Sequence, residues 1–310
     1  MPAPLLECVP NVSEGRDRDT IARLERAITV VRGVRLASVH IDPDHHRSVF
    51  TFLGAPEPVQ AAALSLARAV FETVDMRAHH GIHPRLGALD VLPFVPLRDL
   101  TMADAVTVAR AVAARLAADH QLPVYLYGAA ATAPERRSLL AVRAGQYEGL
   151  PTRLADPSWR PDYGPARFDA RLGAVLVGAR DILVAYNVWL DTSDVAAARA
   201  IARAVRESAG GLPALQAMGA RLERRGIAQV AMNLLDYRVT SLPRAFDAVR
   251  AEAARRGIGV RRGELVGLAP RAAFAGRSPE SVGLVDFRPE LYLDEHIAAP
   301  PEGNFRPSPA

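Results

Sequence analysis

The sequence contains no lysine, and this absence decides how its positive charge is interpreted. All 38 basic residues are arginines, which together with 34 acidic residues give a formal net charge of +4 and a pI near 9.6. The arginines are scattered through alanine-rich stretches, unlike the basic stripe of a nucleic-acid-binding protein. A modest positive field of this kind attracts small anions such as polycarboxylates. We therefore expect no nucleic-acid partner.

Cysteine and long apolar runs are also scarce. Cys8 is the single cysteine, so no internal disulfide can form, which fits the reducing cytoplasm. We expect Cys8 to be a small buried residue of the first strand. No apolar run reaches the roughly 18 residues of a membrane helix, and no basic segment precedes the short apolar stretch at the N-terminus. We predict a cytoplasmic protein without a signal peptide or a membrane partner.

Strand-like and helix-like segments alternate along the chain. We predict strands at residues 5–10, 34–41, 48–53, 89–95, 124–127, 174–177, 182–190, 227–233 and 259–267. We predict helices after residue 16, from residue 56, and over residues 101–119, 193–210 and 243–256. A polar turn covers residues 11–16, and a stretch interrupted by Pro and Gly covers residues 151–173.

The alternation restarts after a break near residue 180. It predicts an α/β (α+β) fold with two subdomains, each a mixed β-sheet covered by helices on one side. We place the subdomains at residues 1–179 and 180–297. The Pro-rich tail, residues 298–310, is expected to be disordered.

Five of the eight histidines lie in two short clusters. The first is His45 and His46, and the second is His79, His80 and His83. The second cluster lies in a loop rich in Gly and Pro between a predicted helix and a predicted strand. Loops held by rigid elements often carry catalytic side chains, and an imidazole takes and returns a proton near neutral pH.

The spacing of these histidines leaves three interpretations open: general acid/base catalysis, hydrogen bonding within a polar loop, and metal binding. His79 and His83 are four residues apart, as in a helical zinc pair. Gly81 and Pro84 disfavour a helix there, and Ile82 stands next to His83, in place of the glutamate of a zincin motif.

A second group of functional side chains lies in residues 159–173. Three aromatic residues and three arginines occur among glycines and prolines: Trp159, Tyr163, Phe168, Arg160, Arg167 and Arg171. Such a composition suits a flat aromatic ligand that bears carboxylates, since rings stack and arginine pairs with acids. An ordinary linker between subdomains would have the same composition. The turn at residues 11–16 similarly suits either an anion or a helix cap.

Four motifs together resemble the formiminotransferase family. They are residues 7–15, residues 123–128, residues 233–237 and the most specific one, His79-x-Gly81-x-His83-Pro84-Arg85-x-Gly87-Ala88-x-Asp90-Val91-x-Pro93-Phe94-Val95-Pro96. The likeness extends from about residue 5 to about residue 270.

The resemblance implies transfer of a formimino group from N-formimino-L-glutamate to N5 of tetrahydrofolate, in histidine degradation. It implies that His83 is the general acid/base, and that folate is a co-substrate with no metal required. The implied folate-binding residues are Gly164, Pro165, Ala166, Arg167, Phe168, Asp169, Ala170, Arg171, Leu172 and Gly173. For the second substrate we expect residues near His83: Asn11, His46, Arg47, His80 and Arg85.

The family also implies a substrate groove between the two subdomains and a homodimer. His46 stands where many relatives have Asn, and Ile82 where relatives often have Glu, which bears on the choice of donor. No cyclodeaminase segment follows, so we expect a separate protein to carry out the next step. Two alternatives are 5-formyltetrahydrofolate:glutamate formyl transfer in folate salvage, and a non-catalytic folate-binding or metal-binding protein.

Overall fold

The computed structural model describes residues 3–298 of the chain. These residues form two units, of which the first ends at Arg180 and the second comprises Asp181–Ala298. The tail predicted to be disordered, residues 298–310, lies outside the described residues except for Ala298.

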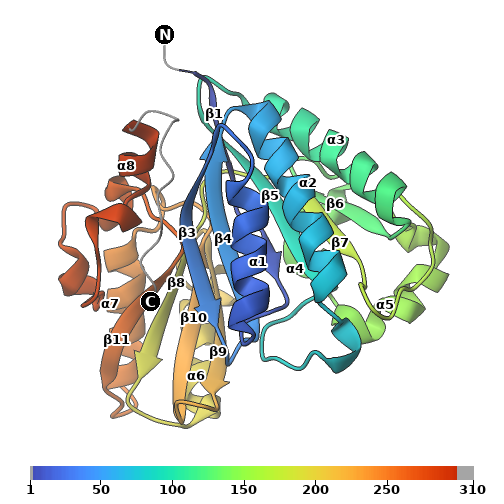
Figure 1. The fold of residues 1–310 in the computed structure, drawn as a ribbon. Coiled ribbons are helices and arrows are strands. Elements are labelled where there is room, and N and C mark those ends of the chain that lie inside the picture. Colours follow the sequence, from blue (N-terminus) through green and yellow to red (C-terminus); the bar gives the residue numbers. More distant parts are fainter. Residues whose placement is uncertain (1–2, 299–310) are drawn as a thin grey trace. The chain divides into compact units, whose positions relative to one another are not determined.

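The first unit is a seven-stranded mixed sheet with helices on both faces (Figure 1). Its strands are β1 (Leu5–Cys8), β2 (Asn11–Val12), β3 (Val34–Asp42), β4 (Arg47–Gly54), β5 (Leu89–Arg98), β6 (Val124–Gly128) and β7 (Val175–Ala179). Its α-helices are α1 (Arg18–Thr29), α2 (Pro56–Thr73), α3 (Met102–His120), α4 (Leu139–Val142) and α5 (Gln146–Ala155). β1 and β2 both lie between β4 and β5. β7 pairs in parallel with β5 and β6, and the other pairs are antiparallel.

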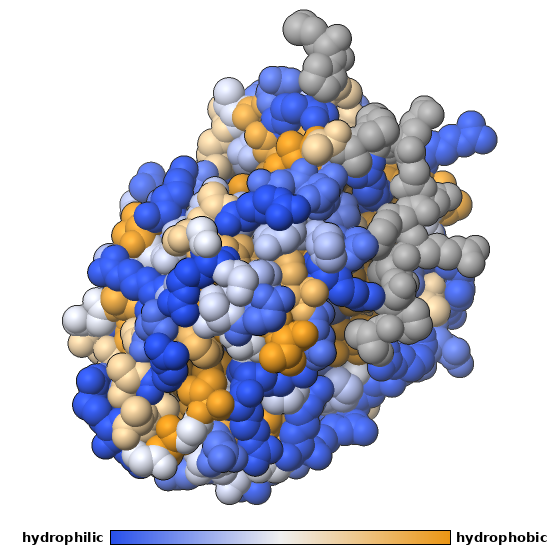
Figure 2. Space-filling view, turned by 90° about the vertical axis from the view of Figure 1, so that its left-hand side faces the viewer, coloured by the Kyte–Doolittle hydropathy of each residue, from blue (hydrophilic) through white to orange (hydrophobic). Residues whose placement is uncertain are grey.

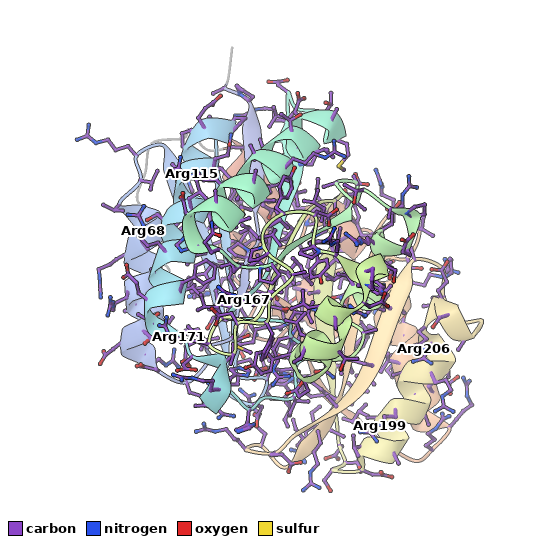
Figure 3. The ribbon with its side chains drawn as sticks, turned by 90° about the vertical axis from the view of Figure 1, so that its right-hand side faces the viewer. Arg68, Arg115, Arg167, Arg171, Arg199 and Arg206 are labelled. Carbon is purple, nitrogen blue, oxygen red and sulfur yellow. The ribbon has the colours of Figure 1, made fainter. Side chains whose placement is uncertain are left out.

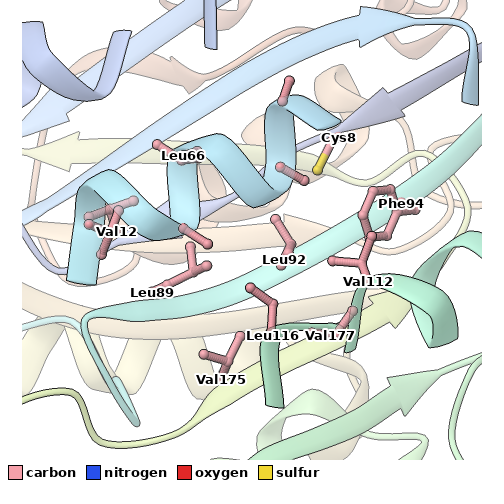
Figure 4. Packing of buried hydrophobic residues seen from close by; sticks show 14 of the residues in the cluster. Cys8, Val12, Leu66, Leu89, Leu92, Phe94, Val112, Leu116, Val175 and Val177 are labelled. Carbon is pink, nitrogen blue, oxygen red and sulfur yellow. The ribbon is translucent and has the colours of Figure 1, made fainter. Parts of the chain in front are cut away.

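Helices α1, α2 and α3 cover one face of this sheet (Figure 1). Side chains such as Leu66 of α2 and Leu116 of α3 pack there on Leu92 and Val177 (Figure 4). Cys8 is fully buried in this core, as predicted. The predicted start of α3 is also confirmed, because Thr101 and Asp104 form a reciprocal capping box.

Helices α4 and α5 lie against the other face, at the β5, β7 and β6 end of the sheet. In β6, Val124 and Leu126 belong to the core beneath α1, α2 and α3. Tyr125 and Tyr127 alternate with them and therefore point to the opposite face of the sheet. There they pack with Leu150 and Leu154, which are four residues apart on α5. Neither α4 nor α5 was predicted from the sequence. The residues from 151 onward were expected to be irregular, but α5 continues through Pro151 to Ala155.

The second unit is a four-stranded antiparallel sheet in the order β11-β8-β10-β9. Its strands are β8 (Val184–Leu190), β9 (Leu215–Leu222), β10 (Ile227–Leu234) and β11 (Val260–Val266). Its α-helices are α6 (Val195–Val205), α7 (Leu242–Ala254) and α8 (Leu293–Ala298). Apolar side chains of α6 and α7, among them Ile201 and Phe246, pack on Val188 and Val230 of the sheet.

The predicted fold class, α/β with two sheets that carry helices, is confirmed. Four details differ. The first sheet carries helices on both faces, rather than on one side. The second sheet is antiparallel throughout, rather than mixed. Strand β9, which pairs with β10 along its whole length, was not predicted. The last predicted strand, at residues 259–267, is β11, an edge strand that pairs only with β8 among the described strands and leaves Arg261 exposed.

Within residues 3–298, no helix combines the length and the apolar composition that crossing a membrane requires. On the face drawn in Figure 2, hydrophobic side chains form small groups among hydrophilic ones. Isolated apolar side chains of this kind are normal on a protein surface.

Candidate functional site

Four segments of the first unit meet at one end of its sheet. They are the turn after β2, the β3–β4 turn, the loop before β5 and the irregular segment before β7. Asn11 pairs with Val49 near the start of β4 and with Val91 near the start of β5. Val91 in turn pairs with Leu176 near the start of β7. The strand register therefore brings both histidine clusters to the same edge.

Glycines set how closely these segments approach. A β-carbon on Gly81 would stand under 3.0 Å from the carbonyl oxygen of His45. One on Gly87 would stand under 3.0 Å from the carbonyl oxygens of Leu172 and Ala174. Because only glycine lacks this atom, the loop before β5 can lie directly against the β3–β4 turn on one side and residues 172–174 on the other.

His79 is held by other protein groups through both ring nitrogens. Its ring stacks on His46, with centroids 4.2 Å apart. Nδ1 accepts a hydrogen bond from Arg85 Nε at 3.3 Å, so Nε2 carries the proton and donates to the His46 carbonyl at 2.8 Å. Burial lowers the pKa of His79 to about 4. His79 therefore has a structural role here and offers no nitrogen to a metal ion.

His45 and His46 are also hydrogen-bonded within the loops. His45 Nδ1 lies 2.7 Å from Asp42 Oδ2, and Asp42 Oδ1 accepts from the backbone N–H of His45 at 2.9 Å. His46 donates from Nδ1 to the carbonyl of His80 at 3.0 Å, and its Nε2 lies 3.4 Å from Glu14 Oε1. Burial opposes ionisation of Glu14, but the hydrogen bond from His46 and two backbone N–H groups lower its pKa to about 2.

His83 differs from these histidines in its surroundings. It lies in the loop before β5, is partly buried, and its ring is 6.2 Å from that of His45 in an edge-to-face arrangement. Burial first, and then the positive charges of Arg47 and Arg143, keep the pKa of His83 well below its usual value. The ring is therefore neutral at neutral pH and has one nitrogen able to accept a proton.

Arg85 links this loop to α5. Its guanidinium donates to both carboxylate oxygens of Glu148, at 2.9 and 2.6 Å. The backbone N–H of Tyr147 donates to the Arg85 carbonyl at 2.8 Å, and the Tyr147 ring lies 5.3 Å from that of Phe168. The Tyr147 hydroxyl donates to the carbonyl of Ala170. α5 therefore ties the His83 loop to residues 164–173.

Asp90 and Arg143 form a buried ion pair beside the same loop. The other oxygen of Asp90 accepts from the backbone N–H of Leu86 at 2.8 Å. Sequence reasoning missed Arg143, which follows the four-residue helix α4. A signal was available at Asp90, since a carboxylate inside an apolar strand requires a partner, but the sequence does not say which arginine supplies it.

Residues 164–173 follow an irregular path. Asp169 Oδ1 accepts from the backbone N–H groups of Arg171 and Leu172, at 2.8 and 2.9 Å. Arg171 donates to the carbonyl of Glu72 at 3.0 Å, which fixes it to the end of α2. Arg167 is exposed and makes no hydrogen bond or ion pair with the residues that the structure describes (Figure 3). Of these two arginines, Arg167 has its whole guanidinium available to a ligand, whereas Arg171 has one Nη group bound to Glu72.

The remaining predicted substrate-binding residues lie near the same edge. Asn11 donates to the carbonyl of Val9 at 3.2 Å and is partly buried. Arg47 begins β4, where its charge acts on His83. His80 is exposed and contributes its backbone carbonyl to His46. The structure therefore brings the predicted residues together, and their roles stay predictions.

Comparison with known families gives two matches that follow each other along the chain. Residues 5–180 match the formiminotransferase domain, N-terminal subdomain, and residues 185–278 match the formiminotransferase domain. Together they span most of the chain.

Curated relatives agree with these matches. The chain is 41% identical over 285 residues to glutamate formimidoyltransferase of Streptococcus pyogenes serotype M1, covering 92% of this chain and 95% of that protein. It is 44% identical over 271 residues to glutamate formimidoyltransferase of Thermoplasma acidophilum, covering 87% and 89%. Formimidoyltransferase-cyclodeaminase of Sus scrofa is 44% identical over 275 residues, covering 87% of this chain and 51% of that protein.

The close approach at Gly81 predicts that Gly81→Ala destabilises the first unit by about 1–3 kcal/mol, because the added methyl group must displace backbone. The matched control is Gly149→Ala in α5, where a β-carbon meets nothing within 4 Å. We expect the control to be neutral or more stable by up to about 1 kcal/mol, since alanine favours a helix. Urea unfolding of both variants measures the difference. Equal stability of the two would contradict the contact.

Proposed function

This chain belongs to the formiminotransferase domain family, and from that premise we propose that it is a one-carbon transferase that moves a formimino group from N-formimino-L-glutamate to N5 of tetrahydrofolate. The support is the pair of family matches and the two relatives named glutamate formimidoyltransferase, nearly all of whose length the chain covers. Tetrahydrofolate serves as co-substrate, and we propose that no metal is needed.

The reaction requires two proton movements. N5 of tetrahydrofolate attacks the formimino carbon and forms a tetrahedral intermediate. N5 then loses its proton, the nitrogen of the departing glutamate gains one, and the bond between that nitrogen and the formimino carbon breaks. One neutral base near both nitrogens can accept the first proton and return it, a contribution of about 10²–10⁴-fold in rate.

We assign that role to His83. The observation that carries the assignment is the neutral, partly exposed imidazole of His83 beside the rings of His45, His46 and His79, which are all hydrogen-bonded. His79 is bonded through both nitrogens, and His45 is bonded to the buried carboxylate of Asp42. Arg47 and Arg143 disfavour a second proton on His83, so the ring returns the proton it accepts.

Residues 164–173 are proposed to bind folate. Arg167 supports this proposal because its guanidinium is exposed and has no partner among the described residues. A guanidinium in this state can pair with a carboxylate of folate. Phe168 and Tyr147 add aromatic surface beside it. The residues proposed to bind the second substrate are Asn11, His46, Arg47, His80 and Arg85, and Arg47 acts on His83 through its charge. Glu148 and His79 already bind the Arg85 guanidinium.

The wider assignments are proposals on the same premise. We propose that residues 1–179 and 180–297 are the two formiminotransferase subdomains, which is supported by the boundary between the two compact units after Arg180. We propose a cytoplasmic homodimer whose partners are small molecules, with no nucleic-acid or membrane partner. The scattered arginines support the absence of a nucleic-acid partner.

A donor assay on the purified full chain tests the activity. Formiminoglutamate with tetrahydrofolate should give glutamate and 5-formiminotetrahydrofolate. 5-Formyltetrahydrofolate with glutamate should react far more slowly. The opposite order would assign the chain to formyl transfer, and failure with both pairs would refute the proposed function.

Replacing the proposed base should remove turnover without removing folate. We expect His83→Asn to lower kcat by about 10²–10⁴-fold, because no other group takes the proton, while tetrahydrofolate still binds. His120→Asn, in the histidine that packs against Phe71 at the end of α3, is the control and should keep its activity. Steady-state kinetics and a folate-binding titration measure both variants. Full turnover by folded His83→Asn protein would remove His83 from the mechanism.

The lowered pKa of His83 predicts the pH dependence of the reaction. A base must be unprotonated, so kcat/KM stays constant as the pH falls until it passes below the lowered pKa. We therefore expect the acid limb of kcat/KM to lie below pH 6.5, the ordinary value for histidine. Rates measured from about pH 5 to about pH 8 test this. A limb at or above pH 6.5 would contradict the surroundings described for His83.

Removal of the Arg167 side chain should weaken folate binding. We expect Arg167→Ala to raise the KM for tetrahydrofolate about two- to fivefold and to change kcat less, as for loss of one exposed ionic contact. Arg115→Ala is the matched control, since Arg115 is an exposed arginine paired with Asp119 on α3 (Figure 3). An unchanged KM in Arg167→Ala would mean that this arginine contacts something other than folate.

A further inference from the structure

Arg143 is a buried arginine that pairs with Asp90 and has a further N–H donor without a partner among the described residues. It is the C-terminal cap of α4, and it is 9% exposed. Its Nη2 donates to Asp90 Oδ2. Its charge reaches His83, whose pKa it helps to lower. Arg143 is linked through Asp90 to Leu86, in the loop that carries His83, although no part of the local sequence pattern points to it.

Asp90 holds Arg143 in position. Asp90 is 2% exposed, and one of its oxygens accepts from Leu86 N–H while the other accepts from Arg143. Leu86 follows His83 by three residues in the same loop. Asp90 therefore connects the Arg143 guanidinium to the loop that carries His83. A guanidinium held in this way loses little conformational entropy when it binds a ligand.

The guanidinium still has donors left over. Arg143 Nε is buried and has no hydrogen-bond partner among the residues that the structure describes. Arg136 offers a comparison, because it is also buried and paired with a carboxylate, Asp162, and its Nε is likewise unpaired within the described residues. Both Nη groups of Arg136 are used, however, by Asp162 and by the carbonyls of Ser158 and Arg160. Arg143 makes one such bond, to Asp90.

Arginine charges act on His83 from two sides of the loop. Arg47 and Arg143 are always protonated and both lower the pKa of His83, while burial raises the pKa of Asp90 and so disfavours its negative charge. An excess positive charge at a partly buried site attracts an anion, and a guanidinium matches the geometry of a carboxylate. Arg85 is unsuited to that task, because Glu148 occupies its two Nη groups.

We propose that Arg143 binds a carboxylate of the amino-acid substrate beside His83, with Asp90 holding the guanidinium in place. This assignment rests on the proposed function, since it takes the substrate to be an N-substituted glutamate. It adds a specificity residue from α4, an element outside the histidine and folate motifs. A substrate with an amide in place of that carboxylate would leave the guanidinium without its anion.

Three variants of the full-length protein test the proposal. Arg143→Gln should raise the KM for formiminoglutamate about 10- to 100-fold and leave the KM for tetrahydrofolate within about twofold, as for loss of a charge-assisted hydrogen bond. Arg143→Lys keeps the charge and should fall between wild type and Arg143→Gln. Arg136→Gln is the matched control: it should lower the melting temperature but leave the KM for formiminoglutamate within about twofold.

A binding titration separates this proposal from the proposed function. L-Glutamate and its diamide, which lacks both carboxylates, are titrated calorimetrically into wild type and into Arg143→Gln, with no turnover required. Wild type should bind glutamate at least about tenfold more tightly than the diamide, and Arg143→Gln should lose that preference. Equal glutamate affinity in both proteins, or a KM change matched by Arg136→Gln, would overturn the role of Arg143. The two proposals can also fail separately. If Arg143→Gln loses glutamate binding but the wild type is inactive with every donor, only the proposed function is overturned.

Discussion

Direct backbone contact on both sides of the loop before β5 is the constraint on which the site depends. Gly81 lies against the carbonyl of His45, and Gly87 lies between the carbonyls of Leu172 and Ala174. A side chain at either position would push the loop away from its neighbours. Because the loop is held on both sides, it places His83 reproducibly although it is neither helix nor strand.

Within that framework, hydrogen-bond partners decide which side chains remain reactive. Two histidine clusters come together, yet His79 and His46 are joined to each other and to backbone carbonyls. Arg85 is joined to Glu148 in the same way. His83 is left as a neutral ring near Arg47 and Arg143. Buried polar groups in proteins are nearly always hydrogen-bonded. Side chains held by such bonds have structural roles, and those with donors or acceptors left are the candidate catalytic or binding residues.

Much of the fold was predictable because its signals are local. The capping box at Thr101 and the apolar spacing of α2 and α7 depend on residues within a few turns of one helix. β9 was missed because Gly219 and the nearby Ala217 and Ala220 favour a strand weakly, and pairing with β10 forms it. α5 was missed for a similar reason, since Gly149 and Pro151 disfavour a helix that packing of Leu150 and Leu154 stabilises.

The family could be identified from the amino-acid sequence, through the long motif around His83, and so could the strands and helices whose periodicity and caps are strong. The partners of each polar residue of the site became known from the folded chain. Arg143 meets Asp90 across 53 residues, and Arg85 meets Glu148 across 63. The physical reason is that a charge takes its partner and its pKa from groups near it in space, and the spacing of residues along the chain does not encode those distances.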